Sequence, residues 1–290
     1  MSDSRAPELS FEFFPPRTEA GRARLPEVYT RLAELDPRFF SVTFGAGGTT
    51  RDFTFDAVQN IARDTGICTA PHLSCVASDK EDLRRLLTQY REHGIKRIVA
   101  LRGDMPSGML GQGEFRYARD LVDFIRAETG DHFDLTVAAY PECHPQAHSF
   151  ERDIDHFVEK VHAGADMAIT QYFFNPDAYH HFVDRVRARG VNIPILPGIM
   201  PITNYTKLAR FSEMCGAEIP RWIRRQLESY GDDSDSIQAF GHEVVTRLCQ
   251  QLLDQGVSGL HFYTLNQADA CTRIVTDLSL AKAGHGLVAG

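Results

Sequence analysis

Short apolar runs alternate along this chain with longer stretches in which apolar residues recur at helical spacing. Eight such runs can be read from the sequence, and each ends in a polar, glycine or proline cluster. They span residues 11–14, 39–44, 70–75, 98–101, 135–140, 167–173, 193–199 and 260–265. Strands that alternate with helices are typical of a parallel sheet, and eight repeats predict an α/β fold of the (β/α)8, or TIM barrel, type.

The stretches between the runs carry signals for helix ends. Asn175 followed by Pro176 predicts an N-cap with proline in the first turn. Ser78 and Glu81 have the spacing of a capping box, and Asn266 is placed to cap the last helix. The punctuation therefore agrees with the predicted strands.

The seventh and eighth runs lie about twice as far apart as the others. This gap has room for extra helices at 206–215, 220–229 and 236–255. We expect them to cover a ligand or to form a subunit contact, and an ordinary surface insertion is the alternative. The whole chain, 1–290, is read as one barrel domain with a mobile Gly/Ala-rich tail at about 281–290.

Composition narrows the function. The 290 residues are 43% hydrophobic, and a barrel of about 250 residues would use nearly all of them. A net charge of -8 argues against nucleic acid or an anionic membrane as the main partner. The first residues lack the apolar core of a secretory signal, and six scattered cysteines form no C-x-x-C pair. We therefore expect a cytoplasmic enzyme with reduced thiols.

The active site of a parallel barrel lies where the strands end, so polar residues that close the runs are the first candidates. Glu12 is flanked by phenylalanines and followed by two prolines. Apolar surroundings raise the pKa of a carboxyl, which predicts that Glu12 stays protonated and acts as a general acid. The alternative is a glutamate paired with an arginine in the barrel floor.

The fourth run ends in Arg102, Gly103 and Asp104. Arg102 can contact a phosphate or a ring carbonyl, Gly103 lets the backbone approach a ligand, and Asp104 can set the potential beside a redox ring. An internal ion pair between Arg102 and Asp104 is the competing interpretation.

Histidines raise the question of a metal. His72 ends the third run, and His144 and His148 follow the fifth, but no histidine and carboxylate set has convincing ligand spacing. We therefore predict no metal, and His72 is either a ligand contact or a core histidine. Neither a G-x-G-x-x-G fingerprint nor a P-loop is present, so any dinucleotide must lie on barrel loops.

Seven motifs at these strand ends, taken in order, closely resemble the methylenetetrahydrofolate reductase family. They are 10–16 (SFEFFPP), 41–43 (SVT), 70–73 (APHL), 100–104 (ALRGD), 139–142 (AYPE), 169–171 (ITQ) and 261–266 (HFYTLN). The resemblance runs from about Leu9 to Leu280 and is greatest for the short bacterial type, which has no regulatory domain after the barrel.

The resemblance implies an FAD-dependent oxidoreductase. It takes hydride from NADH or NADPH and reduces 5,10-methylenetetrahydrofolate to 5-methyltetrahydrofolate, with ping-pong kinetics, a role in methionine synthesis and a homo-oligomeric state. Glu12 matches the family's general acid, and Asp104 matches the carboxylate beside the flavin. Small-molecule substrates are the partners that it implies.

The resemblance also assigns binding positions. Besides Asp104, the FAD positions are Thr43, His72, Arg102, Gly103, Tyr117, Ala118, Tyr140, His144, Asp153 and Lys160. Gln171 and Phe211, with Glu12 and Asp104, match positions that contact folate or the stacked nicotinamide.

Three residues depart from the family pattern. His156 and Glu159 stand where a well-known bacterial member has Asn and Arg, which predicts FAD that dissociates on dilution. Gln267 replaces an arginine, which puts the contact to the folate tail in doubt. The rival functions are a flavin or deazaflavin reductase of another pterin, a metal-dependent hydrolase and a non-catalytic barrel.

Overall fold

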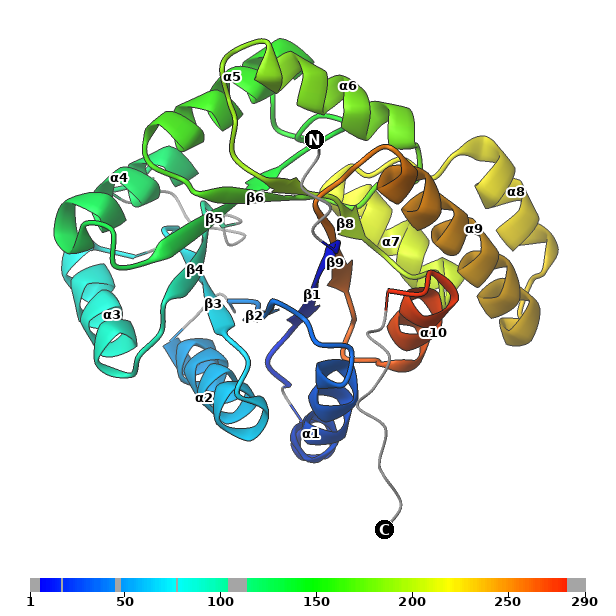
Figure 1. The fold of residues 1–290 in the computed structure, drawn as a ribbon, viewed down its shortest axis with the longest axis horizontal. Coiled ribbons are helices and arrows are strands. Elements are labelled where there is room, and N and C mark those ends of the chain that lie inside the picture. Colours follow the sequence, from blue (N-terminus) through cyan, green and yellow to red (C-terminus); the bar gives the residue numbers. More distant parts are fainter. Residues whose placement is uncertain (1–5, 17, 45–47, 77, 104–113, 281–290) are drawn as a thin grey trace.

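The structure is a barrel of parallel strands surrounded by helices (Figure 1). This computed structural model describes residues 6–16, 18–44, 48–76, 78–103 and 114–280, without the side chains of 48–52. The strands are β1 (Glu8–Phe13), β2 (Phe39–Val42), β3 (Thr69–Ser74), β4 (Arg97–Leu101), β5 (Asp134–Ala139), β6 (Met167–Thr170), β7 (Ile195–Leu196), β8 (Gly198–Ile199) and β9 (Gly259–Tyr263). The predicted TIM-barrel fold is confirmed.

The helices of the described residues form the outer ring. They are α1 (Glu19–Ala33), α2 (Gly48–Thr65), α3 (Lys80–Glu92), α4 (Ala118–Thr129), α5 (Phe150–His162), α6 (Pro176–Arg187), α7 (Tyr205–Cys215), α8 (Arg221–Ser229), α9 (Ser234–Asp254) and α10 (Asp269–Asp277). The helices α7, α8 and α9 lie between the last strands, as the long gap predicts, and stand together on one side of the barrel (Figure 1). The predicted mobile tail, 281–290, lies outside the described residues.

The seventh run, predicted as one strand, is divided at Pro197. Its first half, β7, pairs with β6, and its second half, β8, pairs with β9. Proline has no N–H to give to a neighbouring strand, so the ladder is interrupted there. The Pro197 carbonyl still accepts a hydrogen bond of 3.0 Å from the His261 backbone, and the barrel closes through this short segment.

Two of the predicted helix caps differ from the structure. Asn175 caps α6 as predicted, through its side chain and the Asp177 N–H. The cap of α3 is Asp79, one residue later than the predicted Ser78, because its carboxylate accepts from Asp82 N–H. Asn266 is not a helix cap: its side chain bonds the N–H and the carbonyl of Phe14 and so joins the ends of β9 and β1.

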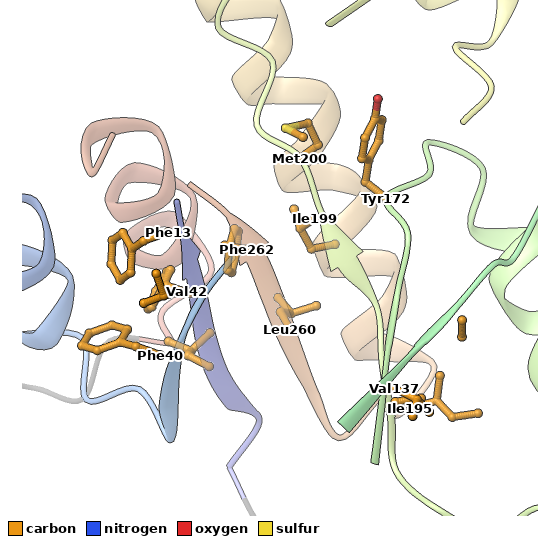
Figure 2. Packing of buried hydrophobic residues seen from close by; sticks show 14 of the residues in the cluster. Phe13, Phe40, Val42, Val137, Tyr172, Ile195, Ile199, Met200, Leu260 and Phe262 are labelled. Carbon is orange, nitrogen blue, oxygen red and sulfur yellow. The ribbon is translucent and has the colours of Figure 1, made fainter. Parts of the chain in front are cut away.

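Side chains of each strand alternate between two packed regions. Phe13, Phe40 and Phe262 point outward and pack under the helices, with the Phe13 and Phe40 ring centres 5.3 Å apart (Figure 2). Phe11 belongs to the same cluster, with its ring centre 5.5 Å from that of Phe262. A smaller cluster, formed by Phe39, Met167, Ile169 and Leu196, fills the barrel interior. The interior of the barrel is therefore filled by side chains, and the barrel is open at the rim formed by the carboxyl ends of the strands.

A glycine sets the width of the barrel at its closure. A Cβ atom on Gly198 would lie 2.1 Å from the Thr170 carbonyl oxygen and 2.7 Å from the Tyr263 ring. Gly198 N–H also donates to Thr170 Oγ1 at 2.9 Å. Only a residue without a side chain lets β8 approach β6 and β9 this closely.

Replacing Gly198 by alanine should lower the free energy of unfolding by about 3 kcal/mol, because backbone rather than a flexible side chain must move to admit the methyl group. Denaturant unfolding measures this. Gly256→Ala is the control: its φ of 83° is strained but nothing lies within 4 Å of the added Cβ, so about 1 kcal/mol is expected. Equal losses in the two variants would contradict the steric explanation.

Candidate active site

A large cavity opens at the carboxyl ends of the strands. It has a volume of about 1560 Å³ among the described residues and is lined from β1, β3, β4, β5, β6 and β9 and from α1, α3 and α7. The sequence-predicted residues that line it are Glu12, Thr43, His72, Gly103, Tyr140, His144, Gln171 and Phe211. Residues that are far apart in the sequence are therefore brought to one rim, as a parallel barrel requires.

Glu12 lies deep in this cavity between two histidines. Its Oε2 atom is 3.2 Å from His72 Nε2 and 3.5 Å from His261 Nε2. The second histidine is fully buried, and its Nδ1 atom shares a hydrogen bond of 2.8 Å with the Ser10 hydroxyl. These residues come from three strands, β1, β3 and β9, and all face the barrel interior.

The ionisation predicted for Glu12 is wrong for this structure. Burial alone raises the pKa of its carboxyl, but His72 and His261 together outweigh burial and bring that pKa down to about 2. Phe11 and Phe13 do not surround the carboxyl, because neighbours along a strand point to the opposite face. Glu12 is therefore a carboxylate at neutral pH, held by histidines rather than protonated among phenylalanines.

The alternative pairing of Glu12 with a floor arginine is also wrong. An arginine does lie in the floor of the barrel, but it is Arg97, and its Nη2 atom pairs with Asp134 at 3.1 Å. Its guanidinium also stacks over the Phe39 ring, 4.7 Å from the ring centre. The arginine in the barrel floor is thus paired with another acid, Asp134, and the Glu12 carboxylate faces the cavity.

The fourth strand end is described only in part. Arg102 donates from Nη2 to Gln146 Oε1 at 2.5 Å, which connects it to the loop after β5. Gly103 has a φ of 85°, and a Cβ there would lie 1.9 Å from Ser74 Oγ, so glycine is required by the neighbouring strand end. Asp104 lies outside the described residues, and its predicted role stays a prediction.

The other predicted cofactor positions do not line the cavity and lie at the ends of α4 and α5. Tyr117 precedes Ala118, the first residue of α4. Asp153 accepts a hydrogen bond of 2.8 Å from the His144 N–H, which fixes the loop after β5. Lys160 donates to the Ala138 carbonyl, and burial lowers the pKa of its amine to about 8.

The two departures on α5 both contact the start of α4. His156 stacks on Tyr117 with the ring centres 5.1 Å apart, and its Nδ1 atom is 3.2 Å from Glu159 Oε2. The same carboxylate oxygen is 2.7 Å from Arg119 Nη1. Glu159 therefore holds a cation of α4 beside the predicted cofactor positions, which sequence reasoning did not find.

The predicted substrate residues come from two sides of the cavity. Gln171 follows β6, and its Oε1 atom accepts from Tyr172 N–H at 3.0 Å. Phe211 lies on α7, and 39% of its surface is exposed. Gln267 is exposed and does not line the cavity.

Sequence reasoning missed His261 and Ser10 as members of the site. Both stand within quoted motifs, two positions from Tyr263 and Glu12 on the same strands. The alternation of side chains in a strand puts such pairs on one face, so the signal was present. Gln146, in contrast, lies in a loop and carries no periodic signal.

A cluster of metal-binding side chains and a membrane-spanning helix are both absent from the described residues. There, no group of three or more His, Cys, Asp or Glu residues could hold a metal ion. No described helix is both long enough and apolar enough to span a membrane.

Comparison with known proteins relates this chain to one enzyme family. The family model described as methylenetetrahydrofolate reductase matches residues 1–279. The 5,10-methylenetetrahydrofolate reductases of Pectobacterium carotovorum and Escherichia coli are each 41% identical over 261 residues, which is 90% of this chain and 86% and 87% of theirs. A methylenetetrahydrofolate reductase (NADH) of Arabidopsis thaliana is 38% identical over 94% of this chain and 48% of its own.

Solved structures support the fold. A Clostridium thermocellum protein that binds two copies of 5-methyl-5,6,7,8-tetrahydrofolic acid superposes with a TM-score of 0.66 at 17% identity, covering 96% of this chain and 95% of its own. At such low sequence identity, the superposition supports the barrel fold and no further property. The family match and the bacterial relatives go further: the chain belongs to the methylenetetrahydrofolate reductase family and is an oxidoreductase of that class.

Proposed function

We propose that this enzyme reduces 5,10-methylenetetrahydrofolate to 5-methyltetrahydrofolate with electrons from NADH or NADPH, which pass through FAD in a ping-pong sequence. The observation that carries the proposal is the Glu12 carboxylate, held between His72 and His261 in a cavity of about 1560 Å³. We further propose that it acts in the cytoplasm as a homo-oligomer and that its product supplies methyl groups for methionine synthesis.

The described residues fit a flavin. Val99, Leu101, Val137 and Ile169 give the cavity apolar walls, and Thr43, His72, Tyr140 and His144 add polar groups. A site with apolar walls and a few converging polar groups suits a flat ring system. Arg102 and Lys160 would hold the phosphates and the ribose side of FAD, which would supply hydride transfer between the nicotinamide and the folate.

Glu12 is the group that handles the proton. Opening the five-membered ring of the folate requires a proton at N10, and the Glu12 carboxyl would deliver it. Because Glu12 is ionised in the open cavity, its carboxylate must take up a proton before it can deliver one, and the histidine nitrogen nearer to Oε2 is His72 Nε2, at 3.2 Å. A bound folate would exclude water, which raises the pKa of the carboxyl and favours this transfer.

Two residues hold the substrate ring. Gln171 can hydrogen-bond the edge of a pterin from the end of β6, and Phe211 can stack on its face from α7. A planar aromatic side chain accepts a nicotinamide equally well. One cavity can therefore serve both substrates in turn.

The test of the proposed function is an anaerobic absorbance titration of the purified protein after addition of FAD. NADH or NADPH should bleach the flavin band, and methylenetetrahydrofolate should restore it. A protein that binds no flavin, or a reduced flavin that the folate leaves unchanged, would refute the proposal.

Replacing Glu12 by glutamine should lower the rate of folate reduction by at least about 10²-fold, since a positioned general acid contributes that much. Reduction of the flavin by NADH or NADPH should change little, because that step needs no proton at N10. Stopped-flow absorbance measures the two half-reactions separately. Glu243→Gln, on the exposed face of α9, is the matched control, and equal loss of both half-reactions in Glu12→Gln would contradict the assignment.

The lowered pKa of Glu12 also predicts an acid-dependent stability. A carboxylate with a native pKa near 2 stabilises the fold above its unfolded pKa and loses that contribution as the pH falls. The difference in unfolding free energy between the wild type and Glu12→Gln should therefore shrink between about pH 4.5 and the onset of acid unfolding. Urea unfolding at a series of pH values measures it, and a difference that grows toward acid would show that histidines do not hold the carboxylate.

Glu159 in place of a cation predicts weak retention of FAD. We expect the cofactor to separate from the protein during gel filtration at low concentration, where absorbance at the flavin band reports it. Glu159→Arg should increase retention, although it also releases Arg119 from its ion pair. The exposed substitution Glu213→Arg on α7 is the control, and full retention of FAD by the wild type would contradict this prediction.

A further inference from the structure

Helix α7 forms one wall of the cavity, but few of its residues are buried in the core. Phe211, Met214 and Cys215 line the cavity from this helix. Its buried residues are Leu208 and Ser212, while Met214 keeps 69% of its surface exposed. Few buried apolar contacts mean low local stability, so the position of α7 depends on its polar contacts to the barrel.

The first of these contacts joins α7 to the end of β6. Tyr172 OH and Ser212 Oγ are 2.9 Å apart, and both side chains are buried. The Cys215 thiol also points to Tyr172 OH, at 3.4 Å. Tyr172 follows Gln171 directly, so this hydrogen bond connects the two sides that are expected to hold the substrate.

The second contact joins the segment after α7 to the loop after β5. Glu142 Oε2 accepts a hydrogen bond of 2.8 Å from the backbone N–H of Glu218, between α7 and α8. Beside it, Gly216 ends α7, and a Cβ there would lie 2.6 Å from Pro145 Cγ. The loop that carries Tyr140 and His144 is thus packed against the end of α7.

We propose that Glu142 and Tyr172 are positioning residues that hold α7 against the barrel rim, so that Phe211 covers the bound substrate. The two contacts lie on either side of one narrow crevice, lined by Tyr140–Cys143, Gln171–Tyr172 and Cys215–Ala217. The role in substrate binding rests on the proposed function, whereas the attachment of α7 does not. Neither residue carries the proton or the hydride.

The charge of Glu142 makes this attachment sensitive to pH. Burial raises the pKa of its carboxyl, the Glu218 N–H opposes that rise, and the Glu218 carboxylate adds to it. The other titratable groups at the crevice are Tyr140, Cys143, Tyr172 and Cys215, with His144 in the same loop. Release of α7 exposes the carboxyl to water and so brings its pKa back toward the ordinary value. Ionisation of Glu142 therefore favours the released state, and the attachment weakens as the pH rises.

Hydrogen–deuterium exchange of the peptides from 205–219, with the flavin-loaded protein, tests the attachment. Glu142→Leu and Tyr172→Phe each remove one hydrogen bond and should speed exchange there about fivefold. Glu142→Gln keeps a hydrogen-bond acceptor but removes the charge. Near neutral pH, the peptides of this variant should therefore exchange no faster than those of the wild type. Any difference in exchange between the two proteins should vanish toward acid pH. Glu213→Gln, an exposed charge change on α7, is the control and should leave exchange unchanged.

Steady-state kinetics supply the second measurement. In Glu142→Leu and Tyr172→Phe we expect the KM for methylenetetrahydrofolate to rise about fivefold, with the flavin content preserved and Glu142→Gln close to the wild type. Wild-type exchange at 205–219 in both variants, or Glu142→Gln behaving as Glu142→Leu, would overturn the proposal. If the protein reduces no folate, the proposed function fails while the exchange result still decides whether these residues hold α7.

Discussion

In a closed barrel of parallel strands, successive side chains point alternately inward and outward, and all strands end at the same rim. The candidate site depends on this constraint at each step. Phe11 and Phe262 face outward and stack with their ring centres 5.5 Å apart, while Glu12 and His261 face inward on the same two strands. The apolar contacts that fix the register of β1 against β9 therefore also fix the distance from the carboxylate to the histidine.

The position of Glu12 has an electrostatic cost that its neighbours offset. A buried carboxylate without partners would take up a proton, but the two histidines keep this one ionised. His261 is itself kept neutral, because burial lowers its pKa more than Glu12 raises it. The Ser10 hydroxyl shares a hydrogen bond with Nδ1 of this histidine and so fixes the orientation of its ring.

Features that repeat along the chain could be predicted from the sequence. The apolar runs located the strands, and the long gap before the last run located α7, α8 and α9, because both depend on local periodicity. The division at Pro197 could have been anticipated, since proline cannot donate to a ladder. The cap at Asp79 differs from the predicted one by a single residue, which is the usual precision of a helix boundary.

Features set by partners distant in the sequence could not be predicted in this way. The phenylalanines around Glu12 suggested an apolar environment, but the environment of a strand residue is made by other strands, here β3 and β9. Asn266 has the composition of a cap, yet its amide bonds Phe14, more than 250 positions earlier in the chain. The candidate site residues could be predicted because they stand at strand ends. Their ionisation could not, because it depends on the distances between side chains of different strands.

The barrel and the inserted helix contribute different physical properties to the cavity. The groups on the barrel, Glu12, His72 and Gln171, stand on or directly after strands whose backbones are fixed on both sides by ladder hydrogen bonds. Phe211 stands on a helix whose attachment to the rim includes two polar contacts, and a hydrogen bond exchanged for one with water changes the free energy far less than opening a packed core does. Under the proposed function, proton delivery requires fixed distances, whereas a wall that accepts first a nicotinamide and then a pterin must adjust. A cavity with a rigid rim and a less firmly attached helix therefore combines fixed distances for the proton with a wall that can adjust to each ring.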